Sequence, residues 1–212
     1  MNDKYGLECL DVDDTTNEFM GEVFQHCISI DAETTGVNPE RNGIVSIGAC
    51  TFKNRQEFYL ENKIREDAEV DAYALSINGF SVEEINNQTK CSEYESLVEL
   101  INFATQNDTF IIVGQNPRFD YEFIKAIWVR NGNDDRKFPF SYRLIDVSGL
   151  VIASWIQARN IIPPKGISSG FVSNVLDVIE EPKPHNALTG AKMNKLHVYS
   201  WINQYCVEDY RP

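Results

Sequence analysis

The sequence has few positive charges. Its 212 residues include 19 lysines and arginines against 32 aspartates and glutamates, which gives a formal net charge of −13. A protein that coats nucleic acid without sequence preference normally carries a basic face, so the composition disfavours that class. A nuclease is compatible with the charge, because bound divalent cations neutralise a cleft that is lined by carboxylates.

Long apolar segments and paired cysteines are also absent. No stretch approaches the ~18 apolar residues of a membrane-spanning helix, so we expect no membrane association. The five cysteines are widely spaced without a C-x-x-C pair, and the N-terminal residues are acidic where a signal peptide would be basic and then apolar. These features predict a reduced, cytoplasmic protein.

The length fits one domain, and the order of the predicted elements indicates its class. Residues 1–25 are polar and acidic, and we expect a mobile or loosely docked extension before a folded domain at 26–212. Strands are predicted at 27–30, 43–52, 57–60, 110–114 and 143–146, and helices at 93–104, 119–128, 147–159, 167–179 and 187–205. Strands come first and then alternate with helices, which predicts an α/β domain with a mixed sheet. No G-x-G-x-x-G motif follows the first strand, which disfavours a Rossmann fold.

The first predicted strand ends in two acids, Asp31 and Glu33, which a Thr-Thr-Gly turn follows. Residues two apart in a strand point to the same face, so the two carboxylates lie side by side. A divalent cation would relieve their repulsion, and hard oxygen ligands suit Mg²⁺ or Mn²⁺. The alternative interpretation is an exposed strand end at which both acids are solvated.

The segment DAETTG at 31–36 resembles the first motif of the DEDD exonucleases. This superfamily includes polymerase proofreading subunits, ribonuclease T and oligoribonuclease. The resemblance implies a ribonuclease-H-like fold, with a mixed five-stranded sheet flanked by helices.

Two later segments resemble the other motifs of the superfamily, in the same order. In GQNPRFD, Asn116 and Phe119 precede Asp120 by four and one positions, as in the second motif, and Asn116 would brace the turn. In PHNALTGAK, His185 matches the histidine of the third motif in the histidine branch. The resemblance covers roughly residues 26–205.

The resemblance implies a role for each matched residue. Asp31, Glu33 and Asp120 would organise two Mg²⁺ or Mn²⁺ ions. His185 would be the general base that activates water, a task suited to a side chain that titrates near neutrality. Asp120 taken alone has a second interpretation as a carboxylate favoured by the dipole at a helix start. Asp146 is expected to cap the helix that follows it.

Residues near these motifs are candidates for contact with the 3′ end of a substrate. Phe80 would stack against the terminal base, as aromatic residues do in single-strand binders, or else pack under its own loop. Arg118, Lys165 and Lys183 are candidate phosphate contacts. The expected substrate-binding residues are Ala32, Thr34, Thr35, Leu75, Asn78, Gly79, Phe80, Asn116 and Arg118.

The fourth acid of the motif set is missing. It would follow the histidine by five residues, where this sequence has Gly190. Loss of this carboxylate is expected to weaken metal binding, and Gly190→Asp is expected to raise activity or metal affinity. Asp177, Glu180 and Glu181 precede the motif in a helix and its exit loop, so a water held by Thr189 or by the substrate phosphate is the expected replacement.

The sequence thus predicts a metal-dependent 3′–5′ exonuclease that releases nucleoside monophosphates from the 3′ end of DNA or RNA, with activity reduced at Gly190. The alternative is an inactive exonuclease-like module that binds single-stranded 3′ ends or a polymerase or repair partner. The expected partners are therefore a single-stranded or frayed 3′ end and a polymerase or repair complex. A homodimer is a further expectation, because many relatives dimerise.

Overall fold

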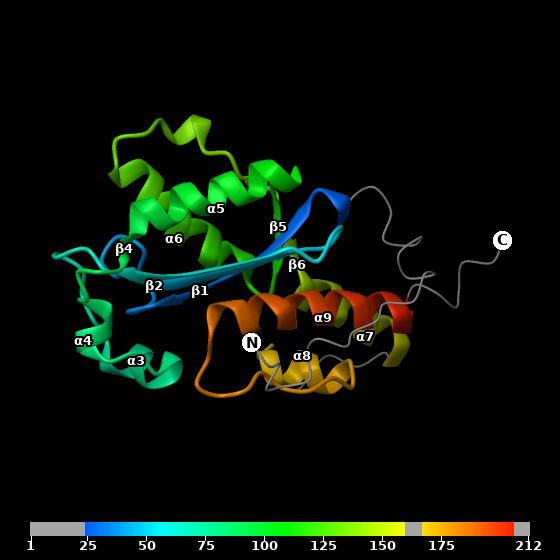
Figure 1. Ribbon diagram of the computed structural model, residues 1–212. Coiled ribbons are helices and arrows are strands. Elements are labelled where there is room, and N and C mark those ends of the chain that lie inside the picture. The colour runs from blue at the N-terminus through cyan, green and yellow to red at the C-terminus, as the bar shows by residue number, and fades with distance from the viewer. Residues whose placement is uncertain (1–23, 160–166, 206–212) are drawn as a thin grey trace.

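The computed structural model describes residues 24–159 and 167–205, and within these ranges the chain forms a mixed sheet with helices on both faces (Figure 1). Six strands lie in the order β4-β3-β2-β1-β5-β6. Their bounds are β1 Cys27–Thr34, β2 Ile44–Thr51, β3 Glu57–Lys63, β4 Cys91–Ser92, β5 Ile111–Gly114 and β6 Ile145–Asp146. The first three strands are an antiparallel meander, and β5 and β6 add in parallel beside β1. The predicted α/β class is confirmed, but the predicted count of five strands is wrong, because the short strand β4 also pairs with β3.

The central strand β1 has a different environment on each face. Ile28, Ile30 and Ala32 pack against the helices α5 (Glu93–Asn107) and α6 (Pro117–Arg130). Alternate residues face the other layer, where the Ser29 hydroxyl donates a hydrogen bond to the Ala191 carbonyl at 2.8 Å. Because strand residues alternate between faces, Asp31 and Glu33 also point to that second layer.

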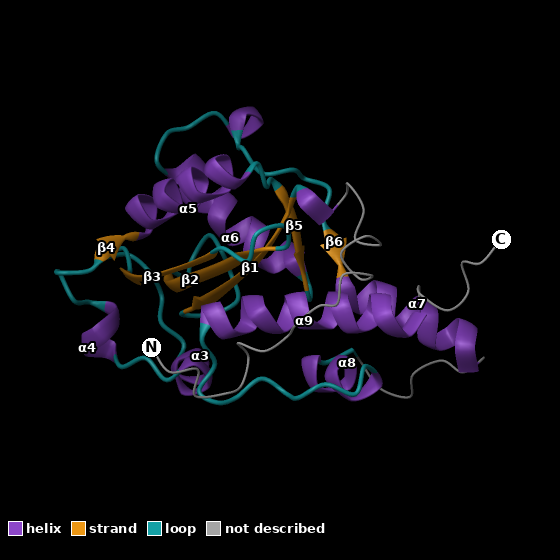
Figure 2. Cartoon of the chain, turned by 45° about the vertical axis from the view of Figure 1, so that its right-hand side comes forward, coloured by secondary structure: helices purple, strands orange, loops and turns teal. Residues whose placement is uncertain are grey.

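The second layer consists of α7 (Val147–Arg159), α8 (Ser169–Val175) and α9 (Ala187–Tyr205), which lie below the sheet in Figures 1 and 2. The first turn of α9 can approach the sheet closely because Gly48 of β2 has no side chain. A Cβ at this position would overlap the backbone of Ala187 and Leu188. Gly48 pairs with Asp31 across the two strands, so the start of α9 lies beside Asp31.

Several predicted elements differ from the structure. No helix or strand is predicted between residues 61 and 92, but the structure has two short helices there, α3 (Ala72–Asn78) and α4 (Val82–Ile85). The helix predicted at 167–179 is shorter, because the backbone of Asp177 adopts a left-handed conformation with φ 53°. Residues 176–186 therefore form a long connection into α9.

The predicted N-terminal extension falls almost wholly on residues 1–23, which lie outside the described residues. Phe24 packs against Phe52, with 5.5 Å between ring centroids.

Within the described ranges, no helix is both long and apolar enough to cross a bilayer.

Candidate active site

The structure places Asp31 and Glu33 side by side at the end of β1. Glu33 is only 9% exposed, and no donor in the described ranges makes a hydrogen bond to its carboxylate. Burial, with the nearby charge of Glu181, raises the pKa of Glu33 to about 7. Burial and the charges of Asp120, Glu33 and Glu181 also raise the pKa of Asp31 well above its usual range. Without a cation, these buried carboxylates destabilise one another.

Asp120 joins this pair from the start of α6. Its Oδ1 accepts a hydrogen bond from the backbone N–H of Ala32 at 2.9 Å, which ties α6 to β1. Burial raises the pKa of Asp120 to about 8, although the hydrogen bond from Ala32 acts in the opposite direction. The second motif thus lies beside the first in space, although 88 residues separate Ala32 from Asp120.

The turn before Asp120 is braced differently from the expectation. The side chain of Asn116 is exposed and makes no capping hydrogen bond, and the residue contributes instead through its left-handed backbone with φ 54°. Asn194 of α9 holds the turn, because its Oδ1 accepts from the Gln115 N–H at 3.0 Å. Asp146 accepts from the Ser148 N–H at 2.9 Å, so it caps α7 as predicted.

His185 lies in the connection between α8 and α9, and backbone contacts hold it in place. Its N–H donates to the carbonyl of Ile77 at 3.1 Å, at the end of α3. The side chain of Asn186 caps α9 by accepting from the N–H groups of Leu188 and Thr189 at 3.0 and 3.3 Å. The third motif is therefore attached both to α3 and to the first turn of α9.

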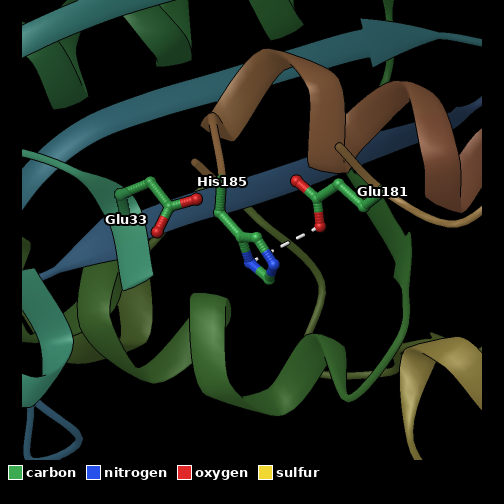
Figure 3. A group of neighbouring side chains, drawn as sticks. All are labelled: Glu33, Glu181 and His185. Carbon is green, nitrogen blue, oxygen red and sulfur yellow. Dashed lines mark ion pairs between the residues drawn. The ribbon is translucent and has the colours of Figure 1, made fainter. Parts of the chain in front are cut away.

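Glu181, to which no role was assigned from the sequence, also lies in this site. Its Oε2 is 3.6 Å from Nδ1 of His185. One ligand atom from each of Glu33, Glu181 and His185 lies within 4.8 Å of the others, and Figure 3 shows the three side chains pointing into one space. The one sequence signal for including Glu181 in the site is that it precedes His185 by four residues. That spacing is informative only once the path of the 176–186 connection is known.

Gly190 faces the carboxylates directly. A Cβ at this position would overlap the carboxylate of Asp31, so the space of the missing side chain is already occupied. Position 190 therefore points at the site, as the third motif implies. The expected benefit of Gly190→Asp must be revised, because the new side chain fits only if Asp31 moves.

A pocket of about 470 Å³ opens beside His185. Phe80 lines it, and the ammonium of Lys90 lies 5.0 Å from the centre of the Phe80 ring. Its lining residues are Tyr59, Glu61, Asn78, Gly79, Phe80, Glu84, Pro182, Pro184, His185, Asn186 and Thr189. Three of the predicted substrate-binding residues, Asn78, Gly79 and Phe80, are thus brought together with His185.

Other predicted substrate residues have their side chains engaged within the chain. The Thr34 hydroxyl donates to the Gly36 carbonyl at 2.6 Å, and the Thr35 hydroxyl donates to the Glu69 carbonyl at 2.7 Å. The side-chain amide of Asn78 donates to the Thr34 carbonyl at 3.1 Å. These bonds fold the turn after β1, and a contact between these residues and substrate stays a prediction.

None of the remaining candidates in the described ranges lines this pocket. Leu75 is half-buried in α3 and does not line it. Arg118 is exposed on α6 and pairs with Glu122 at 3.1 Å. Lys183 is exposed beside the third motif, and Lys165 lies outside the described residues.

The family model RNase_T, described as "Exonuclease", matches residues 28–189 and therefore includes all the residues of the site up to Thr189. The chain belongs to this exonuclease family. The predicted membership of the DEDD superfamily is thereby confirmed.

Particular relatives extend this assignment. The chain is 28% identical over 141 residues to the 3′-5′ DNA exonuclease Cap18 of Escherichia coli, a match that spans 63% of this chain and 73% of the relative. It is 31% identical over 106 residues to the PolC-type DNA polymerase III of Thermotoga petrophila, which covers 49% of this chain and 7% of the polymerase. The zinc-bound structure of E. coli exonuclease I with single-stranded DNA matches with a TM-score of 0.67 at 19% identity, over 83% of this chain and 40% of that one. This structural match confirms the ribonuclease-H-like fold.

Proposed function

We propose that this chain is a metal-dependent 3′–5′ exonuclease that releases nucleoside monophosphates from a single-stranded 3′ end. One observation carries the proposal: Asp31, Glu33 and Asp120 lie together where α6 meets β1, and His185, which lies near Glu33, also lines an open pocket. The names of the relatives support the reaction class, since Cap18 is a 3′-5′ DNA exonuclease.

The donor set fits divalent cations. Asp31, Glu33 and Asp120 offer only oxygen ligands, which suit Mg²⁺ or Mn²⁺, and no donor in the described ranges compensates the charge of the Glu33 carboxylate. We expect these three residues to hold two ions. Such ions supply an activated water and stabilise the charge that develops on the phosphate.

The position of His185 supports the proposed role of general base. Its Nδ1 faces the Glu181 carboxylate, which favours the tautomer with a proton on that nitrogen. The Nε2 atom is then the one that accepts a proton from the attacking water. Because His185 also lines the pocket, this nitrogen can act at the point where the substrate enters.

The pocket beside His185 is the proposed place for the terminal nucleotide. Phe80 presents an aromatic face there, and stacking of one base is worth about 1–3 kcal/mol in proteins that bind single strands. The Lys90 ammonium lies next to the ring, where it forms an ion pair with Glu61 at 2.7 Å. A complex with a polymerase is a further proposal, which the match to the PolC-type polymerase supports.

The test uses 5′-labelled single-stranded DNA and RNA, incubated with the protein and Mn²⁺ and then with EDTA. We expect stepwise shortening from the 3′ end that EDTA abolishes, and a rate about 100-fold to 10,000-fold lower for His185→Ala. Glu99→Gln is the control, because Glu99 is an exposed acid on α5, which packs on the opposite face of the sheet.

The alternative of an inactive binding module follows from Gly190, and the same assay decides it. Retained binding of single-stranded 3′ ends without shortening at high protein concentration would establish the module and overturn the exonuclease. Loss of metal-dependent shortening in His185→Ala, with normal activity in Glu99→Gln, would establish the enzyme.

A further inference from the structure

Position 190 lacks the carboxylate that the third motif requires, but other carboxylates lie nearby. The carboxylate of Asp31 fills the place where a side chain at Gly190 would begin. A replacement for the missing ligand must therefore come from another direction. Within the described ranges, Glu181 is the one further acid that groups with Glu33 and His185 at distances suitable for metal binding.

Glu181 is largely buried, and protein groups satisfy only part of its carboxylate. Only 13% of its side chain is exposed. Burial raises the pKa of its carboxyl, and the backbone N–H of Asn186 acts to lower it. Its Oε2 faces His185 at 3.6 Å, but no group in the described ranges bonds to its buried Oε1 atom. A buried carboxylate oxygen normally has a donor or a cation beside it, because its desolvation is otherwise uncompensated.

Glu33 provides a second, independent observation. The residue is only 9% exposed, no donor in the described part of the chain bonds to its carboxylate, and its side chain points toward Glu181 (Figure 3). The nearest ligand atoms of Glu33, Glu181 and His185 all lie within 4.8 Å of one another. Two oxygens bound to one Mg²⁺ at about 2.1 Å each lie about 3–4 Å apart, so a small side-chain movement brings both onto the same ion.

We propose that Glu181 is a metal ligand that replaces the carboxylate absent at position 190, and that it shares a divalent cation with Glu33. The inference rests on the proposed metal-dependent function and adds a residue to its metal site. It also replaces the earlier expectation that a water held by Thr189 or by the substrate phosphate takes this place. Four carboxylates then serve the site, from Asp31, Glu33, Asp120 and Glu181.

The competing role for Glu181 is to position His185 through their 3.6 Å ion pair. The two roles differ in what they affect. A ligand contributes to cation affinity in the absence of substrate, whereas a residue that only orients the base affects turnover and leaves cation affinity unchanged.

The experiment measures Mn²⁺ affinity of the full-length protein without nucleic acid, by calorimetric titration and by the Mn²⁺-induced rise in melting temperature. We expect Glu181→Gln to weaken Mn²⁺ binding about tenfold or more and to lower the Mn²⁺-induced rise accordingly. Glu180→Gln is the matched control, because it is the adjacent acid on the same connection, is exposed, and lies over Gly170 of α8. We expect its Mn²⁺ affinity to stay within about twofold of the wild type.

The outcomes separate the two proposals. Wild-type affinity in Glu181→Gln, together with reduced turnover, would show that Glu181 only positions His185 and would overturn the inference while the exonuclease stands. Tight Mn²⁺ binding that depends on Glu181, in a protein that degrades no 3′ end, would support the ligand and overturn the exonuclease. Melting curves without metal show whether Glu181→Gln is folded, and we expect no loss because the change removes one repelling charge.

Discussion

The candidate site has two sides that are held in different ways. The strand side consists of Asp31, Glu33 and Asp120, and the loop side consists of Glu181 and His185. On the strand side, the pairing of β1 with β2 and the bond from Ala32 to Asp120 determine where the carboxylates point. On the loop side, the positions depend on the path of the 176–186 connection across other elements.

A few contacts hold that path. The N–H of His185 is bonded to the carbonyl of Ile77, and the ring of Pro184 packs on Gly79 at the end of α3. Behind the connection, α8 is tied to α9 by Ser173 and His197, whose Oγ and Nε2 atoms are 2.9 Å apart. Local strand geometry therefore positions Asp31 and Glu33, and a single bond over 88 positions adds Asp120. The loop side depends entirely on packing between distant elements.

The largest expected effect comes from removing a charge on the strand side. Asp120→Asn keeps an oxygen that can accept from Ala32, so the anchor between α6 and β1 is retained while a metal ligand becomes neutral. We expect kcat/KM with Mn²⁺ to fall about 1,000-fold, which corresponds to about 4 kcal/mol. Steady-state assays and melting curves check this, with Glu99→Gln as the charge control. Activity within tenfold of the wild type would show that Asp120 is only an anchor.

A smaller effect is expected behind the loop side, at His197. Burial lowers the pKa of this histidine to about 4, below its ordinary 6.5, so the unfolded chain binds the proton more tightly. Its contribution to stability is present above pH 6.5 and is lost as the pH falls toward 4. Between pH 7 and pH 5 this loss is about 2 kcal/mol.

The measurement is urea unfolding of the metal-free wild type and of His197→Gln at both pH values. Glutamine retains a group that can bond to Ser173 but does not titrate. We expect the wild type to lose about 2 kcal/mol more than the variant on acidification. Equal losses in the two proteins would mean that His197 is not the buried neutral group that the packing of α8 on α9 requires.

The smallest expected effect comes from a substitution at Gly190, which contacts Asp31 of the strand side. In Gly190→Ala, the new methyl group displaces the Asp31 carboxylate, and we expect Mn²⁺ affinity to fall about fivefold, or about 1 kcal/mol. The stability of the metal-free fold should not decrease, because alanine favours the helix by up to ~1 kcal/mol. Gly149→Ala in α7 is the control, since a Cβ there meets nothing within 4 Å. Unchanged Mn²⁺ affinity in Gly190→Ala would show that Asp31 tolerates the displacement.

Much of the strand side was predictable from local pattern. An apolar run followed by D-x-E predicts a buried strand that ends in two parallel carboxylates, and β1 has this form. The second motif predicts a turn and a helix that begins near Asp120, as α6 does. The strand β4 was missed because its two residues carry no periodic signal, and α3 and α4 were missed because they are short.

The sequence by itself determined the α/β order of elements, the exonuclease motifs and the absence of an acid at position 190, because each depends on residues close together in the chain. Only the tertiary structure decided that Asp31 fills the space at Gly190, that Asn194 braces the second motif, and that Glu181 faces Glu33. In these three contacts the residues are far apart in the sequence. Gln115 and Asn194 are 79 positions apart, Glu33 and Glu181 are 148 apart, and Asp31 and Gly190 are 159 apart. No periodicity encodes such contacts, since they follow from how α9 and the 176–186 connection pack on the sheet.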